Sequence, residues 1–343
     1  PSSGDDNSAP ASKPKADILA KNITLNAVNG YIGASGNDLD INSSYSGSGV
    51  VTTTSKENTY IIETTGDLSL YQAGTGAAAT AFFTAPGGSI LNGRNDGGSN
   101  IVSGKTYLVA NTDIGSEANP FKTEVGNIEG ISTTGSSWVK NKGALTVGGV
   151  VPGTGMTGAG TVKLEASSPV YVDENITAPV IWLYARDDAD DTGTDKADNL
   201  VVKAGVTINA TAASLPLGFP PLLLAAGDDL ILEDGARIIT PGKARFYLDY
   251  NNQDAGKIGV LDVHDNAVIT ASRVEIYGSD ENDVIPITFN TSDTYVYGGD
   301  GDDTIHVGSN ADSASNSGGN VNGITALLQI DGQAGNDRVI VDE

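Results

Sequence analysis

A segment rich in glycine and aspartate near the C-terminal end has the residue types and spacing of a cation-binding turn. Residues 298 to 306 read GGDGDDTIH. The glycines allow a tight turn whose carbonyls face one side, the aspartates add charged oxygens, and Ile305 begins a short apolar strand. Calcium takes about six to eight oxygen ligands, so one such turn supplies only part of a coordination shell. A second turn must stack on it.

Two neighbouring segments carry degenerate versions of this turn. They read GSDENDVI from residue 278 and GQAGNDRVI from residue 332, with Ser279, Glu281 and Gln333 at glycine positions. In a fold of stacked coils of about 20 residues, the starts at 278 and 298 lie about one coil apart. The start at 332 lies one coil further on if a Ser/Asn/Gly-rich excursion near 309–322 is looped out. We therefore expect all three turns to stack on one edge. The predicted metal-site residues are Gly278, Asp280, Asp283, Gly298, Gly299, Asp300, Gly301, Asp303, Gly332, Ala334, Gly335 and Asp337.

Residues 298–306 match the nonapeptide G-G-x-G-x-D-x-U-x at every specified position and so resemble the calcium-binding RTX repeats. The resemblance implies that consecutive turns share an ion through backbone carbonyls plus one aspartate from each turn. Calcium is thus the expected cofactor, with Asp283, Asp303 and Asp337 as carboxylates. The pair of turns at 278 and 298 is expected to bind more weakly, because Ser279 and Glu281 carry Cβ atoms. The alternative is that these turns are ordinary corners of an acidic fold.

A second acidic segment, RDDADDTGTDKAD, covers residues 186 to 198. A solvated corner loop and an ion-binding loop are both compatible with it. Its EF-hand-like opening lacks the final glutamate, since the twelfth position is Asn199. Its aspartates are Asp187, Asp188, Asp190, Asp191, Asp195 and Asp198.

The composition restricts the chemistry and the partners. The 343 residues include 43 acidic and 19 basic residues, no cysteine and two histidines, and the formal net charge is -24. Disulfides and cysteine-bound zinc are excluded, which leaves oxygen as the available metal ligand. The negative charge repels phosphate backbones and anionic lipids. We expect cations as partners, no nucleic acid and no membrane insertion.

The elements that must position these turns are short strands. Runs such as ILAKNITLNAVNG (18–30) and GDDLILEDG (227–235) are rich in β-branched or aliphatic residues and end in Gly, Asn or Asp. No segment has a sustained helical period. The phrase IGASGNDLDIN at 32 is repeated as IGSEANPFKTEV at 114, at a distance of roughly four coils of about 20 residues. We predict an all-β fold, a single right-handed parallel β-helix or β-solenoid with an RTX-like β-roll edge at its C-terminal end.

This pattern predicts three regions. Residues 1–15 are rich in Ser, Pro and Asp and are expected to form an extended arm or linker. Residues 16–277 are expected to form the parallel β-helix. Residues 278–343 are expected to form calcium-binding coils that continue the solenoid.

The phrases IGASGNDLDIN, IGSEANPFKTEV, GALTVGGV and AAGDDLIL resemble the repeats of large secreted bacterial surface proteins of the filamentous-haemagglutinin type. The resemblance implies a parallel β-helix at the cell exterior, an adhesive or structural role, and no catalytic residues. Other copies of the chain, in a fibre or surface layer, and a cell-surface receptor or glycan are the partners it suggests. The alternative is a β-helical polysaccharide lyase or hydrolase, for which Arg186 and Lys196 beside the second acidic segment would be the basic residues.

Overall fold

The chain folds almost entirely into short parallel β-strands. The computed structural model describes residues 16–186, 198–251, 259–264, 266–311 and 318–342, and within these ranges the only helical element is a 3-10 turn at Pro216–Gly218. In the same ranges, no helix has the length and apolar character needed to cross a membrane. The predicted all-β class is confirmed, and the long parallel ladders are consistent with a β-helix or solenoid.

The chain divides into two compact parts. The N-terminal part comprises Pro1–Gly143 and Gly148–Leu164, and the C-terminal part comprises Ala144–Val147 and Glu165–Glu343. Strand β16 (Thr161–Ala166) contains the last boundary between the two parts, after Leu164. The predicted arm at residues 1–15 lies outside the described residues, and the predicted border at residue 277 stays a prediction.

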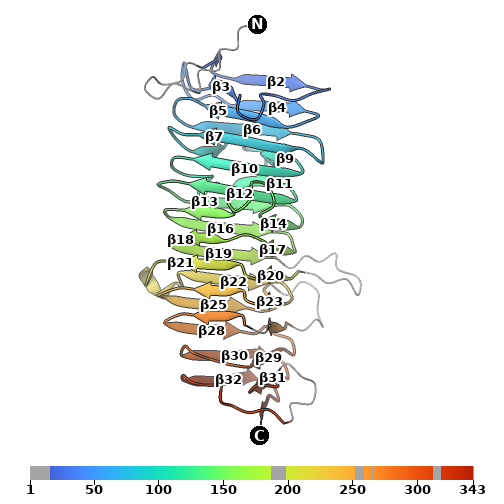
Figure 1. Cartoon of the computed structure of the whole chain (residues 1–343), viewed down its shortest axis with the longest axis vertical. Coiled ribbons are helices and arrows are strands. Elements are labelled where there is room, and N and C mark those ends of the chain that lie inside the picture. The colour runs from blue at the N-terminus through green and yellow to red at the C-terminus, as the bar shows by residue number, and fades with distance from the viewer. Residues whose placement is uncertain (1–15, 187–197, 252–258, 265, 312–317, 343) are drawn as a thin grey trace. The chain divides into compact units, whose positions relative to one another are not determined.

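The N-terminal part contains two parallel ladders, whose strands follow one another from coil to coil (Figure 1). The first ladder consists of β1 (Ile18–Leu19), β3 (Leu39–Asn42), β5 (Thr59–Glu63), β7 (Thr80–Ala85), β10 (Lys105–Ala110), β12 (Asn127–Ser132) and β15 (Met156–Gly158). The second consists of β2 (Ile23–Ala27), β4 (Val51–Ser55), β6 (Leu68–Gly74), β9 (Ile101–Val102), β11 (Phe121–Glu124) and β13 (Ser137–Asn141), with β8 (Ile90–Asn92) also beside β6.

The C-terminal part contains four parallel ladders. The first consists of β14 (Leu145–Val147), β17 (Val170–Val172), β20 (Leu200–Val202), β23 (Leu230–Leu232) and β26 (Leu261–Val263). The second consists of β18 (Ile176–Ala178), β21 (Thr207–Ala210), β24 (Arg237–Ile239) and β27 (Val268–Thr270). The third consists of β19 (Val180–Ala185), β22 (Leu222–Ala226), β25 (Lys243–Tyr247), β28 (Arg273–Tyr277), β30 (Thr294–Asp300) and β32 (Leu328–Ala334). The fourth consists of β29 (Val284–Ile287), β31 (Thr304–Val307) and β33 (Arg338–Val341).

Alternate side chains of successive strands fill the interior of each part. In the N-terminal part, Ile61, Phe83 and Leu108 occupy paired positions in β5, β7 and β10, and each is at most 1% exposed. In the C-terminal part, Leu200 and Leu230 pair in the same way and are fully buried. Side chains of a strand alternate between its two faces, so a register that repeats from coil to coil produces continuous apolar columns.

The coils differ in length, whereas the sequence predicted a uniform coil of roughly 20 residues. Equivalent positions in consecutive coils are 20 apart in the chain at Asp283 and Asp303, but 30 apart at Asp198 and Asp228. The longer coils of the C-terminal part each contain an additional strand, such as β21 or β24. The uniform length expected from the sequence is therefore wrong for these coils.

The repeated phrase beginning at residues 32 and 114 does not mark equivalent positions in the coils. Ile32 forms a bridge with Thr59, which begins β5 in the first ladder, whereas Ile114 forms a bridge with Ser137, which begins β13 in the second. The expectation that the two phrases lie a whole number of coils apart is therefore wrong. The phrase encodes a local turn that the chain uses at two different corners.

Candidate calcium site

The three glycine-rich turns lie in register at one corner of the C-terminal part. They connect β28, β30 and β32 to β29, β31 and β33, respectively (Figure 1). Ile285 pairs with Ile305, and Ile305 pairs with Val339. The stacking predicted from the spacing of the three turns is confirmed.

Hydrogen bonds join the aspartates of successive turns into a column. The backbone N–H of Asp283 donates to Oδ1 of Asp303 at 2.9 Å, and the N–H of Asp303 donates to Oδ1 of Asp337 at 3.2 Å. One coil earlier, the N–H of Gly259 donates to Oδ1 of Asp283 at 2.9 Å. Each carboxylate therefore satisfies a backbone donor in the preceding coil with one of its two oxygens.

The second oxygen of Asp303 has no such partner. Asp303 is 1% exposed, and its Oδ2 forms no hydrogen bond among the described residues. This oxygen lies against Gly298, where a Cβ atom would overlap it. A buried anionic oxygen without a donor costs free energy, so a cation at this position would be stabilising.

The other two carboxylates also lie against the first glycine of their own turns. A Cβ atom at Gly278 or Gly332 would overlap Oδ2 of Asp283 or Asp337, respectively. Oδ2 of Asp283 accepts a hydrogen bond from the backbone N–H of Ser279 at 2.6 Å. Asp283 is 1% exposed, whereas Asp337 is exposed. The aspartate of the middle turn is thus both buried and incompletely hydrogen-bonded.

The middle and last turns have the left-handed backbone that the glycine pattern indicates. Gly299, Gly301 and Gly335 have φ values of +119°, +104° and +142°. Gly299 and Gly301 pack directly on the carbonyls of Ser279 and Glu281, which themselves lie outside the left-handed region. The first turn therefore has a different conformation from the other two. The weaker binding expected of the pair of turns at 278 and 298 stays a prediction.

Burial shifts the titration of the two inner carboxyls. It raises the pKa of Asp283 to about 6, against the opposing effect of the hydrogen bonds from Ser279 and Gly259. Burial also raises the pKa of Asp303, and the nearby carboxylates of Asp337 and Asp302 add to the increase. Both groups are in surroundings that disfavour the bare anion and would favour a bound cation.

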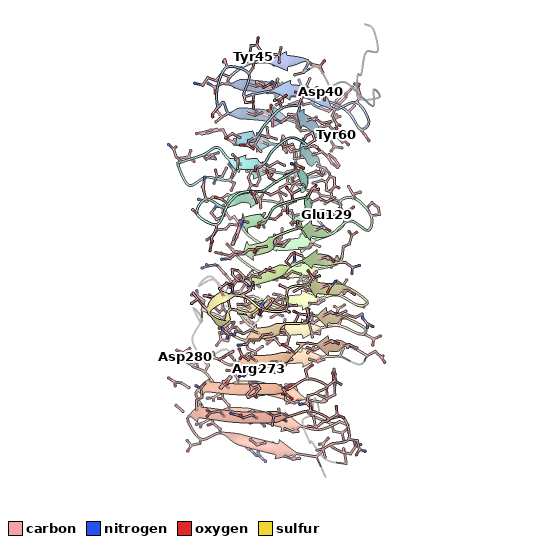
Figure 2. The ribbon with its side chains drawn as sticks, turned by 90° about the vertical axis from the view of Figure 1, so that its left-hand side faces the viewer. Asp40, Tyr45, Tyr60, Glu129, Arg273 and Asp280 are labelled. Carbon is pink, nitrogen blue, oxygen red and sulfur yellow. The ribbon has the colours of Figure 1, made fainter. Side chains whose placement is uncertain are left out.

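The remaining carboxylates of the turns face outward. Asp280, Asp300 and Asp302 are exposed, and Asp280 lies on the outside of the C-terminal part (Figure 2). Oδ1 of Asp302 accepts a hydrogen bond from the backbone N–H of Asn336 at 2.8 Å. Ala334 pairs with Asp300 in the ladder of β30 and β32. The contacts of Asp302 and Asp300 therefore join the middle and last turns on their outer side.

The aspartate column extends beyond the predicted turns. The N–H of Asp198 donates to Oδ2 of Asp228 at 3.0 Å, and both side chains are buried. The register of β20, β23, β26 and β29 places Asp198, Asp228 and Gly259 one coil apart, in line with Asp283. Sequence reasoning missed this continuity. The available signal was an Asp two positions before a Leu, Ile or Val of the ladder, and from Asp198 to Asp337 Gly259 is the single described interruption.

The available ligands suit calcium and not a metal that needs several side-chain ligands. Within the described ranges, no three His, Asp or Glu side chains converge closely enough to hold a metal ion. Each cation at the turns would depend on backbone carbonyls together with the carboxylates of two consecutive turns, either Asp283 and Asp303 or Asp303 and Asp337. Calcium accepts such mixed oxygen ligands. The residues therefore fit the expected ion.

Most of the second acidic segment lies outside the described residues, including its aspartates from Asp187 to Asp195 and Lys196. Arg186 is described, and its Nε contacts Oε1 of Glu165 at 2.5 Å. Of the segment's aspartates, Asp198 is described, and it belongs to the buried column.

No protein-family model matches the chain, and neither a curated protein nor a solved structure is significantly similar to it.

Proposed function

We propose that the chain is a structural or adhesive module of a bacterial surface protein, located outside the cell and rigidified by calcium. In this proposal the parallel ladders belong to a right-handed β-solenoid, and the three glycine-rich turns form an RTX-like edge. Other copies of the chain, in a fibre or surface layer, or a receptor on another cell are its partners.

The observation that carries the calcium role is the buried Oδ2 of Asp303, which has no hydrogen-bond partner in the described structure. It lies in the middle of three turns in register. The backbone carbonyl oxygens of Ser279 and Glu281 in the first turn lie close to Gly299 and Gly301 of this middle turn. A cation there would neutralise the buried charge and join consecutive coils. The external location and the adhesive role are supported by the resemblance of the repeated phrases to secreted surface proteins.

No specific observation favours the alternative of a polysaccharide lyase or hydrolase. A lyase needs a basic residue that can take a proton from the substrate. Arg186, the described basic residue of the second acidic segment, is engaged with Glu165.

The calcium role is tested by titration calorimetry and thermal unfolding of a sample first freed of calcium. We expect heat of binding and a higher melting temperature when calcium is added. At calcium near 100 times Kd, each site adds roughly 2.7 kcal/mol to the stability of the unit that carries it. When aspartates of the turns are substituted, the control for the lost charge is Glu117→Gln. This substitution removes one negative charge from an exposed turn of the N-terminal part. Absence of binding heat and of any shift in melting would refute the calcium role.

A further inference from the structure

The N-terminal part has a concave site at a corner where three successive coils turn from the second ladder to the first. We call it the corner pocket. It is an open depression between loops 28–38, 56–58 and 75–79 with a volume of about 630 Å³. Specific small-ligand sites are concavities of roughly 300 to 1,000 Å³ with a few convergent polar groups. The size of the corner pocket is therefore suitable for a ligand of one to a few rings.

The longest of the three loops forms a preorganised wall. Loop 28–38 is closed by two backbone hydrogen bonds between Ala34 and Asn37, each 2.9 Å. Its base is held by Ile32, which is 7% exposed and forms a bridge with Thr59. The small residues of 76–79 also line the pocket. A pocket with a fixed wall and small lining residues loses little conformational entropy when a ligand binds.

Tyr60 supplies an oriented hydrogen-bond donor. Its ring stacks on Phe82 with centroids 4.5 Å apart and an interplanar angle of 6°. Asn58 is held by the backbone N–H of Thr80 and donates through Nδ2 to the hydroxyl of Tyr60 at 3.1 Å. Because this hydroxyl already accepts a hydrogen bond, its own proton is left to donate. No acceptor for that proton is found in the part of the chain that the structure describes.

The rim combines an exposed aromatic ring with polar groups that are not engaged elsewhere. Tyr31 is 61% exposed. The side chains of Ser35, Lys56 and Glu57 also line the pocket and make no hydrogen bond or ion pair within the described ranges. One cation and one anion give the rim no net charge, in a chain whose formal net charge is -24. An uncharged ligand fits this rim better than an anion does.

We propose that the corner pocket binds a neutral saccharide. The apolar C–H face of a sugar ring would pack on Tyr31, and its hydroxyls would exchange hydrogen bonds with Tyr60, Ser35, Lys56 and Glu57. Tyrosine provides an apolar face and a polar edge in one rigid side chain, which suits such a ligand. This inference rests on the adhesive role proposed above and gives its partner a chemical class.

Saturation-transfer NMR with maltose, lactose and cellobiose, followed by titration, tests the proposal on the full chain. At least one of these disaccharides is expected to bind. Tyr31→Ala should then weaken binding about tenfold, and Tyr60→Phe, which removes the hydroxyl, about fivefold. The matched control is Tyr45→Ala, because Tyr45 is 66% exposed and lies away from Tyr60 (Figure 2). Circular dichroism of each variant shows that it is folded.

Three outcomes would overturn the saccharide proposal: no binding of any of the three sugars, equal losses in Tyr31→Ala and Tyr45→Ala, or tighter binding of a uronate dimer than of the neutral sugars. Repeating the titration in calcium and in chelator separates this proposal from the calcium role. Sugar binding without calcium binding refutes only the calcium role. Calcium binding without sugar binding refutes only the corner pocket.

Discussion

The backbone N–H of Asp283 donates a hydrogen bond to Oδ1 of Asp303, 2.9 Å away in the following coil. This contact leaves Oδ2 of Asp303 buried and without a hydrogen-bond donor among the described residues. One carboxylate thus joins two coils and presents a second oxygen for an ion. The predictions below follow from this arrangement and from the packing that supports it.

Asp303→Ala should reduce calcium binding more than Asp337→Ala. Asp303 belongs to the middle turn, which would contribute to both of the proposed sites, whereas Asp337 belongs to an outer turn and is exposed. Titration calorimetry should show a lower stoichiometry or a larger loss of affinity for Asp303→Ala. Equal effects of the two substitutions would contradict the stacked arrangement of ions.

Without calcium, the protein should lose stability as the pH rises from about 4 to about 6. The pKa of Asp283 is raised from 3.8 to about 6 in the folded state. The folded state therefore holds this proton more tightly than the unfolded state does. The stabilising effect is complete below about pH 4 and is lost as the pH rises through 6, with a change on the order of 3 kcal/mol. Bound calcium should suppress this loss, because it stabilises the anion.

Urea unfolding at several pH values measures this effect, and Asp283→Asn provides the comparison. Burial also raises the pKa of Glu63 to about 6 and raises the pKa of Asp303, so these two residues add their own losses of stability as the pH rises. The difference between the unmodified protein and Asp283→Asn isolates the part due to Asp283. Identical pH profiles for the two proteins would show that Asp283 does not titrate in this way.

Gly298→Ala should both destabilise the C-terminal part and weaken calcium binding. A Cβ atom at this position would overlap Oδ2 of Asp303. Overpacking of this kind costs about 1 to 3 kcal/mol. Gly30→Ala is the control, since a Cβ atom there has no neighbour within 4 Å. Chemical unfolding and calcium titration of both variants check the prediction, which fails if the two behave alike.

Phe83→Ala should destabilise the N-terminal part by about 3 to 5 kcal/mol, because the ring is fully buried in an interior column. Leu217→Ala, at a side chain that is 95% exposed, should change stability by no more than about 0.5 kcal/mol. Denaturant unfolding measures both values. A loss below about 1 kcal/mol for Phe83→Ala would mean that the column is loosely packed.

The strand content and the stacked turns could be predicted from the sequence, because both depend on short-range patterns. Ile285, Ile305 and Val339 each follow an aspartate by two positions, and this spacing sets the register whatever the length of the intervening loop. The coil length could not be predicted in the same way. A third strand inside a coil has the same β-branched composition as the others, so nothing in the residues 207–210 distinguishes an additional strand from the next coil.

The corner turns show a second limit of sequence patterns. Gly33 and Gly115 have nearly the same φ, +64° and +67°, and occupy the same position in the repeated phrase. The phrase specifies this local turn and contains no information about which corner it serves. The aspartate column was missed for a related reason. Gly259 interrupts it, and hydrogen-bonded members of the column are as many as 34 residues apart in the sequence.

The hydrogen bonds from backbone N–H groups to the aspartate side chains of this column all run in one direction along the chain. Gly259, Asp283 and Asp303 each donate to the aspartate of the coil that follows them, and Asp198 donates to Asp228 in the same sense. At these four positions the backbone donor is therefore satisfied only when the next coil is in place. A chain that folds from its N-terminal end would complete these corners in order, and each newly docked coil would secure the one before it.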